Sequence, residues 1–171
     1  MREVICGLYI ILFTFITAPM RYINTRSQDP QQIKDGQAKN YRLAQRMSKG
    51  IIKISGIKLD IKGGENLNNN GATVYMGTHK SYLDIVIMLA LIDQPLIFIG
   101  KEELRRVPFI RTWFKDVGGV AMQRDDIRQS YKVIMEVIEK LKEGYSVAIF
   151  PEGTRAITKD MGEFKVGSFK L

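Results

Sequence analysis

The first feature of the chain is an apolar run without charge from Val4 to Met20, with charged residues on both sides. At 17 residues, the run reaches the lower end of the roughly 17–25 residues that a helix needs to cross a bilayer. Three interpretations compete: a transmembrane helix, a hairpin-like or interfacial anchor, and a secretory signal peptide. No small-x-small cleavage site follows the run, which disfavours the signal peptide. We therefore expect residues 1–26 to be a hydrophobic membrane anchor.

Residues 27–53 combine a polar start with a basic amphipathic pattern. The stretch from Ser27 to Gly36 is polar and contains a proline, which predicts a loop. From Ala38 to about Ile52, apolar residues recur at helical spacing and basic residues cover the other positions. Such a helix either lies on a membrane surface or packs on the folded domain with its charges in water. The sequence leaves both interpretations open.

From residue 54 onward, β-like and helical patterns alternate. Short apolar runs bounded by turn residues predict strands, and helical spacing predicts the elements between them. This alternation is typical of an α/β fold with a mixed, largely parallel sheet flanked by helices, which we assign to residues 54–171. The predicted strands lie at 57–61, 72–76, 96–99, 117–122 and 147–150. The predicted helices lie at about 82–92, at 102–116 with a break at Pro108, and from Asp125 or Asp126 to about Lys142, with a core face of Ile127, Tyr131, Ile134, Val137, Ile138 and Leu141.

The net charge of +8 is concentrated behind the apolar run. Residues 21–62 carry ten Lys or Arg against three Asp or Glu, whereas residues 63–171 carry fifteen against fourteen. A nucleic-acid-binding protein spreads its basic residues over a folded face with stacking aromatic side chains, so we expect no nucleic acid. A basic segment next to an apolar one favours an anionic membrane surface as partner. The positive-inside rule then predicts the cytoplasmic face of the cell membrane.

Three polar loops follow predicted strands, at residues 78–84, 123–124 and 152–155. In a parallel sheet such loops meet at the carboxyl edge, where α/β folds bind their ligands. The first loop holds His79, the only histidine of the chain and the first candidate for a base, because imidazole exchanges protons near neutral pH. Ser81 and Asp84 fit an S-x-x-D capping box at the start of the next helix, so Asp84 alternatively serves only as a cap.

The other two loops suit a phosphate group. Arginine matches a phosphate bidentately, and a glycine lets backbone N–H groups approach an anion closely. Together with His79, these arginines and this glycine indicate a phosphorylated substrate that bears a hydroxyl group. A surface ion pair of Glu152 with Arg155 and a solvent-exposed Lys101 are the alternatives. The candidate site residues are His79 and Asp84 for catalysis, and Lys101, Arg124, Glu152, Gly153, Thr154 and Arg155 for substrate binding.

Other chemistries lack the residues that they need. The sequence contains no G-x-S-x-G, G-x-G-x-x-G or Walker A motif. One histidine and a single cysteine, Cys6, cannot build an ordinary zinc site, so we expect no metal. Ser81 lies two residues from His79, but a serine that caps a helix is a poor nucleophile. Direct attack by a substrate hydroxyl is therefore preferred to an acyl-enzyme.

These motifs carry a family resemblance. The pattern His79-x4-Asp84, the segment Gly119 to Arg124 and Phe150-Pro-Glu-Gly-Thr-Arg155 resemble, in order and spacing, the first three motifs of the glycerolipid acyltransferases, most closely the 1-acyl-sn-glycerol-3-phosphate acyltransferases. H-x4-D alone is a weak signal, whereas its combination with F-P-E-G-T-R about 70 residues later is specific. The resemblance covers roughly residues 50–171 and implies the fold already expected from the pattern.

The resemblance also implies a reaction. The family transfers a fatty acyl group from acyl carrier protein or coenzyme A to the sn-2 hydroxyl of lysophosphatidic acid, with the thioester as co-substrate and no cofactor. His79 would be the general base, Asp84 would orient its ring, and Arg124 with residues 152–155 would hold the phosphate. Glycerol-3-phosphate or another lysolipid is the alternative acceptor, and a non-catalytic basic membrane-binding protein is the rival class. The chain ends at Leu171, before the family's fourth motif, so we expect a C-terminally incomplete domain.

Overall fold

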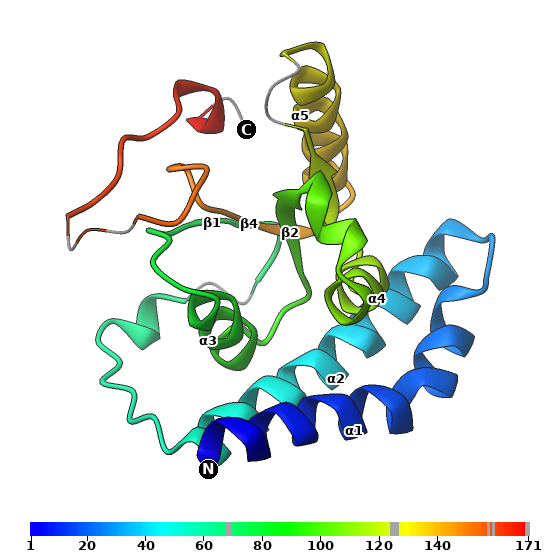
Figure 1. Ribbon diagram of the computed structural model, residues 1–171. Coiled ribbons are helices and arrows are strands. Elements are labelled where there is room, and N and C mark those ends of the chain that lie inside the picture. Colours follow the sequence, from blue (N-terminus) through cyan, green and yellow to red (C-terminus); the bar gives the residue numbers. More distant parts are fainter. Residues whose placement is uncertain (68–69, 124–126, 157, 159, 170–171) are drawn as a thin grey trace.

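The computed structural model describes residues 1–67, 70–123, 127–156, 158 and 160–169. Its centre is a four-stranded sheet in the order β1-β4-β2-β3, in which every pairing among the described strands is parallel (Figure 1). The strands are β1 (Val74–Met76), β2 (Leu96–Lys101), β3 (Val120–Met122) and β4 (Ser146–Ile149). The predicted α/β class with a largely parallel sheet is confirmed.

Helices cover both faces of the sheet, because successive side chains of a strand point to opposite sides. Leu96 and Phe98 of β2 belong to a core shared with α2 (Pro30–Ser55), α3 (Leu83–Leu91) and α4 (Pro108–Asp116). Ile97, between them, belongs to a second core under α5 (Ile127–Lys142). The result is a three-layer arrangement with α5 on one face and the other helices on the opposite face (Figure 1). Short 3₁₀ turns at Gly64–Asn66, Glu102–Arg106 and Val166–Phe169 complete the described elements.

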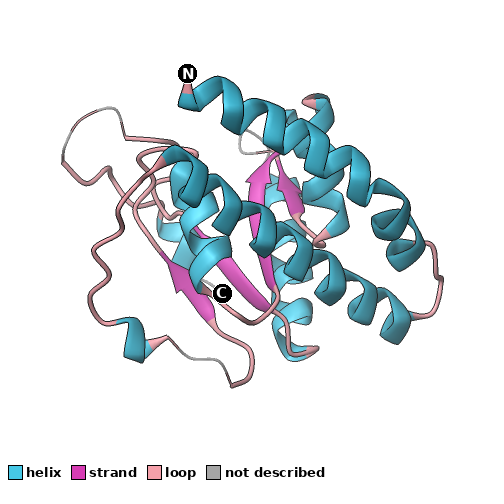
Figure 2. Ribbon diagram, turned by 90° about the horizontal axis from the view of Figure 1, so that it is seen from below, coloured by secondary structure: helices cyan, strands magenta, loops and turns pink. Residues whose placement is uncertain are grey.

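The N-terminal segments form a hairpin of two long helices that lie side by side, α1 (Arg2–Thr25) and α2 (Figures 1 and 2). The loop predicted at 27–36 is wrong for most of its length, since α2 begins at Pro30. Asp29 explains this early start: its side chain accepts the N–H of Gln32 at 2.9 Å, and proline suits the first helical turn. Gly56, with φ of 74°, ends the helix.

A close approach of the two helices depends on glycine. A Cβ atom on Gly36 would lie 1.7 Å from the carbonyl oxygen of Asn24, and one on Gly50 would lie 2.2 Å from the hydroxyl of Tyr9. Both positions face α1, so a larger side chain would push the helices apart. The hairpin is thus packed along its length.

A buried ion pair ties α1 to the sheet domain. Arg21 is only 4% exposed and pairs with Asp116 at the end of α4. Its guanidinium also donates to the carbonyl of Thr14 at 3.0 Å and lies 4.2 Å from the ring centroid of Trp113. Burial raises the pKa of Asp116, although Arg21 acts to lower it. Helix α1 and the sheet domain therefore share one packed interior.

Two predicted details are wrong, and one lies outside the described residues. Residues 57–61 form no strand, although the alternation is real: Ile57 and Leu59 are half-buried in an extended stretch that pairs with no described strand. Tyr131 is 64% exposed rather than part of the α5 core face, which instead centres on Val133 and Val137. The helix expected at about 82–92 is present as α3, Leu83–Leu91. The caps expected at 125–126 fall on residues that the structure does not describe.

Candidate active site

The loops that follow β1 and β4 meet because these strands are parallel neighbours. Met76 pairs with Ile149, so the chain continues from both strands at the same edge of the sheet. The amide of Ala156 donates to the carbonyl of His79 at 2.9 Å, and the amide of His79 donates to Oε1 of Glu152 at 3.3 Å. The structure therefore brings together two of the three loops that were expected to meet.

His79 and Asp84 form a hydrogen-bonded pair. Nδ1 of His79 lies 3.0 Å from Oδ2 of Asp84, and the two side chains are 16% and 23% exposed. The same oxygen accepts the backbone N–H groups of Lys80 at 2.7 Å and Ser81 at 2.8 Å. Burial acts to raise the pKa of Asp84, but these N–H groups and the His79 ring outweigh it and hold the pKa below its usual value. The carboxylate stays ionised, and Nε2 of His79 remains for a substrate.

Ser81 acts locally, at the start of α3. Its Oγ accepts the N–H of Leu83 at 3.0 Å and donates to Oδ1 of Asp84 at 3.4 Å. The predicted capping box is thus present in part: Asp84 bonds the Ser81 amide, whereas the serine hydroxyl bonds the amide two residues on rather than three. A hydroxyl engaged in this way supports the helix terminus, as expected.

Glu152 and Gly153 shape the loop after β4. Glu152 is 3% exposed, and its carboxylate lies beneath the backbone of His79. Gly153 has φ of 72°, which a residue with a side chain rarely adopts, and its amide closes a turn on the carbonyl of Phe150 at 2.9 Å. The structure thus places Glu152 as a support of the His79 loop. Substrate binding by Glu152 and Gly153 stays a prediction.

Thr154 and Arg155 line a hollow of about 390 Å³ together with Lys80 and Ala156. The guanidinium of Arg155 lies 4.2 Å from the ring centroid of Tyr82. Nζ of Lys80 donates to the carbonyl of Thr158 at 3.2 Å and to that of Asp160. Two cations thus border a hollow whose lining includes Lys80, the sequence neighbour of His79, and Ala156, whose amide bonds the His79 carbonyl.

The remaining predicted site residues lie elsewhere or are not described. Lys101 is exposed at the end of β2 and is not among the described residues that line this hollow. Arg124 lies outside the described residues. Lys80 and Tyr82 were not among the predicted site residues; only their places in the loop that carries His79 could have drawn attention to them. Among the residues that the structure describes, no three His, Cys, Asp or Glu side chains gather into a metal site.

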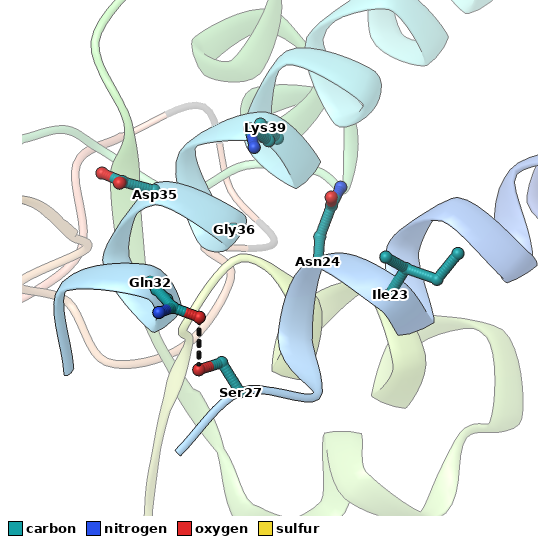
Figure 3. Close-up of a pocket in the computed structure, with 7 residues that line it drawn as sticks. All are labelled: Ile23, Asn24, Ser27, Gln32, Asp35, Gly36 and Lys39. Carbon is teal, nitrogen blue, oxygen red and sulfur yellow. Dashed lines mark hydrogen bonds between the residues drawn. The ribbon is translucent and has the colours of Figure 1, made fainter. Parts of the chain in front are cut away.

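A second hollow, of about 210 Å³, lies at the turn of the helical hairpin. Figure 3 shows its lining, with the hydroxyl of Ser27 hydrogen-bonded to Oε1 of Gln32 at 3.0 Å. It holds none of the predicted site residues, and Figure 1 places this turn across the molecule from the β1 loop. Its lining residues are Ile23, Asn24, Ser27, Gln32, Asp35, Gly36 and Lys39.

Comparison with known sequences identifies the family of the chain. The chain belongs to the acyltransferase family, because the model of that family matches residues 58–171. The family resemblance noted in the sequence is therefore confirmed.

Particular relatives are named for one reaction. The chain is 34% identical over 134 residues to the 1-acyl-sn-glycerol-3-phosphate acyltransferase of Borreliella burgdorferi, an alignment that covers 76% of this chain and 54% of that protein. It is 37% identical over 115 residues to the chloroplastic 1-acyl-sn-glycerol-3-phosphate acyltransferase BAT2 of Brassica napus, covering 67% of this chain and 33% of that protein. The chain thus spans about half, or less, of the length of these relatives.

A solved structure shows the same fold. The 1-acyl-sn-glycerophosphate (LPA) acyltransferase PlsC from Thermotoga maritima superimposes with a TM-score of 0.66 at 24% sequence identity, covering 99% of this chain and 69% of that one. The superposition includes the helical hairpin, since nearly the whole chain is covered.

Proposed function

We propose that this chain transfers a fatty acyl group from an acyl-carrier-protein or coenzyme A thioester to the sn-2 hydroxyl of lysophosphatidic acid. The observation that carries the proposal is the His79–Asp84 pair, which lies in the same loop as Lys80, one of the two cations that border the hollow. The named activity of the relatives supports the choice of acceptor.

The geometry suggests how the reaction proceeds. Nε2 of His79 takes the proton of the acceptor hydroxyl as its oxygen attacks the thioester carbonyl, and Asp84 stabilises the imidazolium that forms. The tetrahedral intermediate collapses with cleavage of the C–S bond, and the imidazolium returns the proton to the thiolate. Lys80 and Arg155 bind the phosphate and thereby hold the hydroxyl against His79. This positioning lowers the activation barrier, because the entropy of bringing the reactants together is already lost when the substrate binds.

The helical hairpin supports a membrane location. Of the described helices, α1 alone is long and apolar enough to cross a membrane. Its outward side chains are largely exposed, at 61–69%: Val4, Leu8, Leu12, Phe15 and Ile16. The exposed cations of α2 recur every three or four residues, which places them on one face: Lys39, Arg42, Arg46, Lys49 and Lys53.

We infer that the hairpin lies in one interface of the membrane and does not span it. Crossing a bilayer would remove α1 from α2 along its length and would separate Arg21 from Asp116. An apolar face beside a row of cations instead suits the head-group boundary of an anionic leaflet. The basic residues after α1 support a location at the cytoplasmic face of the cell membrane, because the anionic lipids of that leaflet attract Lys and Arg side chains.

The test is acyl transfer in anionic vesicles that contain lysophosphatidic acid, glycerol-3-phosphate or lysophosphatidylcholine, with labelled acyl carrier protein or coenzyme A thioester as donor. We expect turnover with lysophosphatidic acid. His79→Ala and His79→Asn, the second of which keeps a polar group beside Asp84, should reduce kcat by about 10²–10⁴-fold without loss of vesicle binding. Vesicle binding by the wild-type chain with no transfer to any acceptor would favour the non-catalytic class instead.

A further inference from the structure

The imidazole ring of His79 is in contact with a residue that the mechanism above does not use. The ring of Phe150 stacks on it with a centroid separation of 4.2 Å and an angle of 19° between the planes. Phe150 directly follows β4, and His79 follows β1, the parallel neighbour of β4 in the sheet. The register of the two strands therefore brings the rings face to face.

The stack restrains the orientation of the imidazole plane of His79, which the hydrogen bonds do not restrain. Asp84 holds the edge of the imidazole at Nδ1, while Glu152 and Ala156 hold the backbone of His79. None of these contacts touches the face of the ring. Phe150 occupies that face, so the imidazole keeps Nε2 in one plane.

The stack also has an electrostatic consequence. The face of a phenyl ring carries partial negative charge, which attracts a cation placed over it. His79 is neutral when it accepts the proton of the acceptor and positively charged while the tetrahedral intermediate exists. The attraction to Phe150 is therefore stronger in the transition state than in the ground state, and only such a difference raises kcat.

We propose that Phe150 is a positioning residue whose ring face stabilises the imidazolium form of His79 during acyl transfer. The inference rests on the proposed function and involves the same bond changes. The O–H bond of the acceptor breaks and its proton moves to Nε2, a C–O bond forms, and the C–S bond of the thioester breaks. The imidazolium over Phe150 then returns the proton to the thiolate.

The contribution should appear in kcat and leave KM unchanged. A cation over an aromatic face that is partly shielded from water is worth a factor of about 3–30 in an equilibrium. We therefore expect Phe150→Leu to lower kcat about tenfold, with KM within about twofold of wild type. Phe150→Tyr keeps the ring face and should restore most of the activity. Phe169→Leu, which removes an exposed ring that contacts Phe164, is the matched control and should leave kcat as in wild type.

Fluorinated phenylalanine at position 150 separates the charge effect from packing. Para-fluoro and pentafluoro rings keep the shape of the stack while the negative charge on the face is reduced and then reversed. We expect kcat to fall in that order with KM unchanged. Because His79 is the only histidine, its two ring C–H protons give NMR signals that no other histidine overlaps. Their upfield ring-current shift should persist in the fluorinated proteins and disappear in Phe150→Leu.

The outcomes are distinct. Equal kcat for wild type, Phe150→Leu and the fluorinated proteins, or an NMR spectrum without the ring-current shift, would overturn the role of Phe150 while leaving the proposed function intact. Absence of turnover in the wild-type chain with every acceptor would overturn the proposed function, and this inference with it.

Discussion

Neutralising Asp116 should destabilise the protein more than any surface change, because it leaves a buried cation without its partner. Arg21 is 4% exposed and the Asp116 side chain 14% exposed. Removing one member of a buried ion pair typically costs about 3–5 kcal/mol. In Asp116→Asn, Arg21 keeps its bond to the carbonyl of Thr14 and its place over Trp113. We therefore expect a loss near the lower end, about 3 kcal/mol in the free energy of unfolding.

The opposite substitution, Arg21→Met, should cost less and should depend on pH. A guanidinium stays charged, whereas a carboxyl group can take up a proton. Burial already raises the pKa of Asp116, and losing Arg21 raises it further. A raised folded-state pKa stabilises the protein at pH values below the unfolded-state pKa, and this stabilisation is lost as pH rises through the folded-state pKa. Arg21→Met should therefore be more destabilising at pH 8 than at pH 5, unlike Asp116→Asn.

The assay is urea unfolding in mild detergent, followed by the fluorescence of Trp113, which is the only tryptophan of the chain and lies over Arg21. The double variant Arg21→Met/Asp116→Leu replaces both charges by apolar groups and should unfold within about 1 kcal/mol of wild type. A cost below about 1 kcal/mol for Asp116→Asn, or a cost of Arg21→Met that does not change with pH, would refute the buried-pair account.

Three further predictions concern a cap, a glycine and a carboxylate. Ser81→Ala should lower the free energy of unfolding by about 1 kcal/mol and kcat by less than about tenfold, whereas an acyl-enzyme mechanism would require a loss of about a thousandfold or more; urea unfolding and initial rates decide. Gly36→Ala, whose Cβ would lie 1.7 Å from the Asn24 carbonyl oxygen, should cost at least about 2 kcal/mol, while Gly7→Ala, with nothing within 4 Å, should be neutral or stabilising in the same thermal scan. The pKa of Asp84 is lowered, so its stabilisation is present above the unfolded-state value of about 4 and is lost as pH falls through the folded-state value; the decline of Tm on acidification should be shallower in Asp84→Asn, and an unchanged decline would contradict the assignment.

The sheet could be predicted from the sequence because its inner strands are buried on both faces. Such strands appear as uninterrupted apolar runs, as at 96–99 and 147–149. Turn residues after these runs then marked the loops, and parallel pairing brought two of them together. This logic located His79, Asp84 and residues 152–155 without any contact information.

The predictions were wrong where one sequence pattern is compatible with two different structures. Alternation at 57–61 reports alternating exposure, which an extended segment shows with or without a pairing partner. In α5, two apolar stripes overlap at Val137, one through Tyr131 and Ile134 and one through Val133 and Leu141. Which stripe meets the sheet depends on how the helix is rotated, and that depends on side chains of β2, β3 and β4 that are distant in sequence.

Contacts between side chains of different loops could not be predicted from the hydrophobic and polar pattern of the sequence. The pairs Phe150 with His79 and Arg155 with Tyr82 are about 70 residues apart in sequence. Strand order predicts that their loops meet, whereas the choice of stacking partners follows from the register of β1 and β4 and from the turn at Gly153. The pairing of Arg21 with Asp116 likewise needs the packing of α1 on α4.

Helix α2 links α1 to the His79–Asp84 pair. On one side α2 packs closely against α1 through Gly36 and Gly50. On the other, the hydroxyl of Tyr41 donates to the carbonyl of Ile92 at 2.9 Å, at the end of α3. Because α3 carries Asp84 in its first turn, a continuous path of packed helices leads from the apolar face of α1 to the His79–Asp84 pair. A flexible linker would let that pair take any orientation relative to α1, whereas this packing holds it in one orientation.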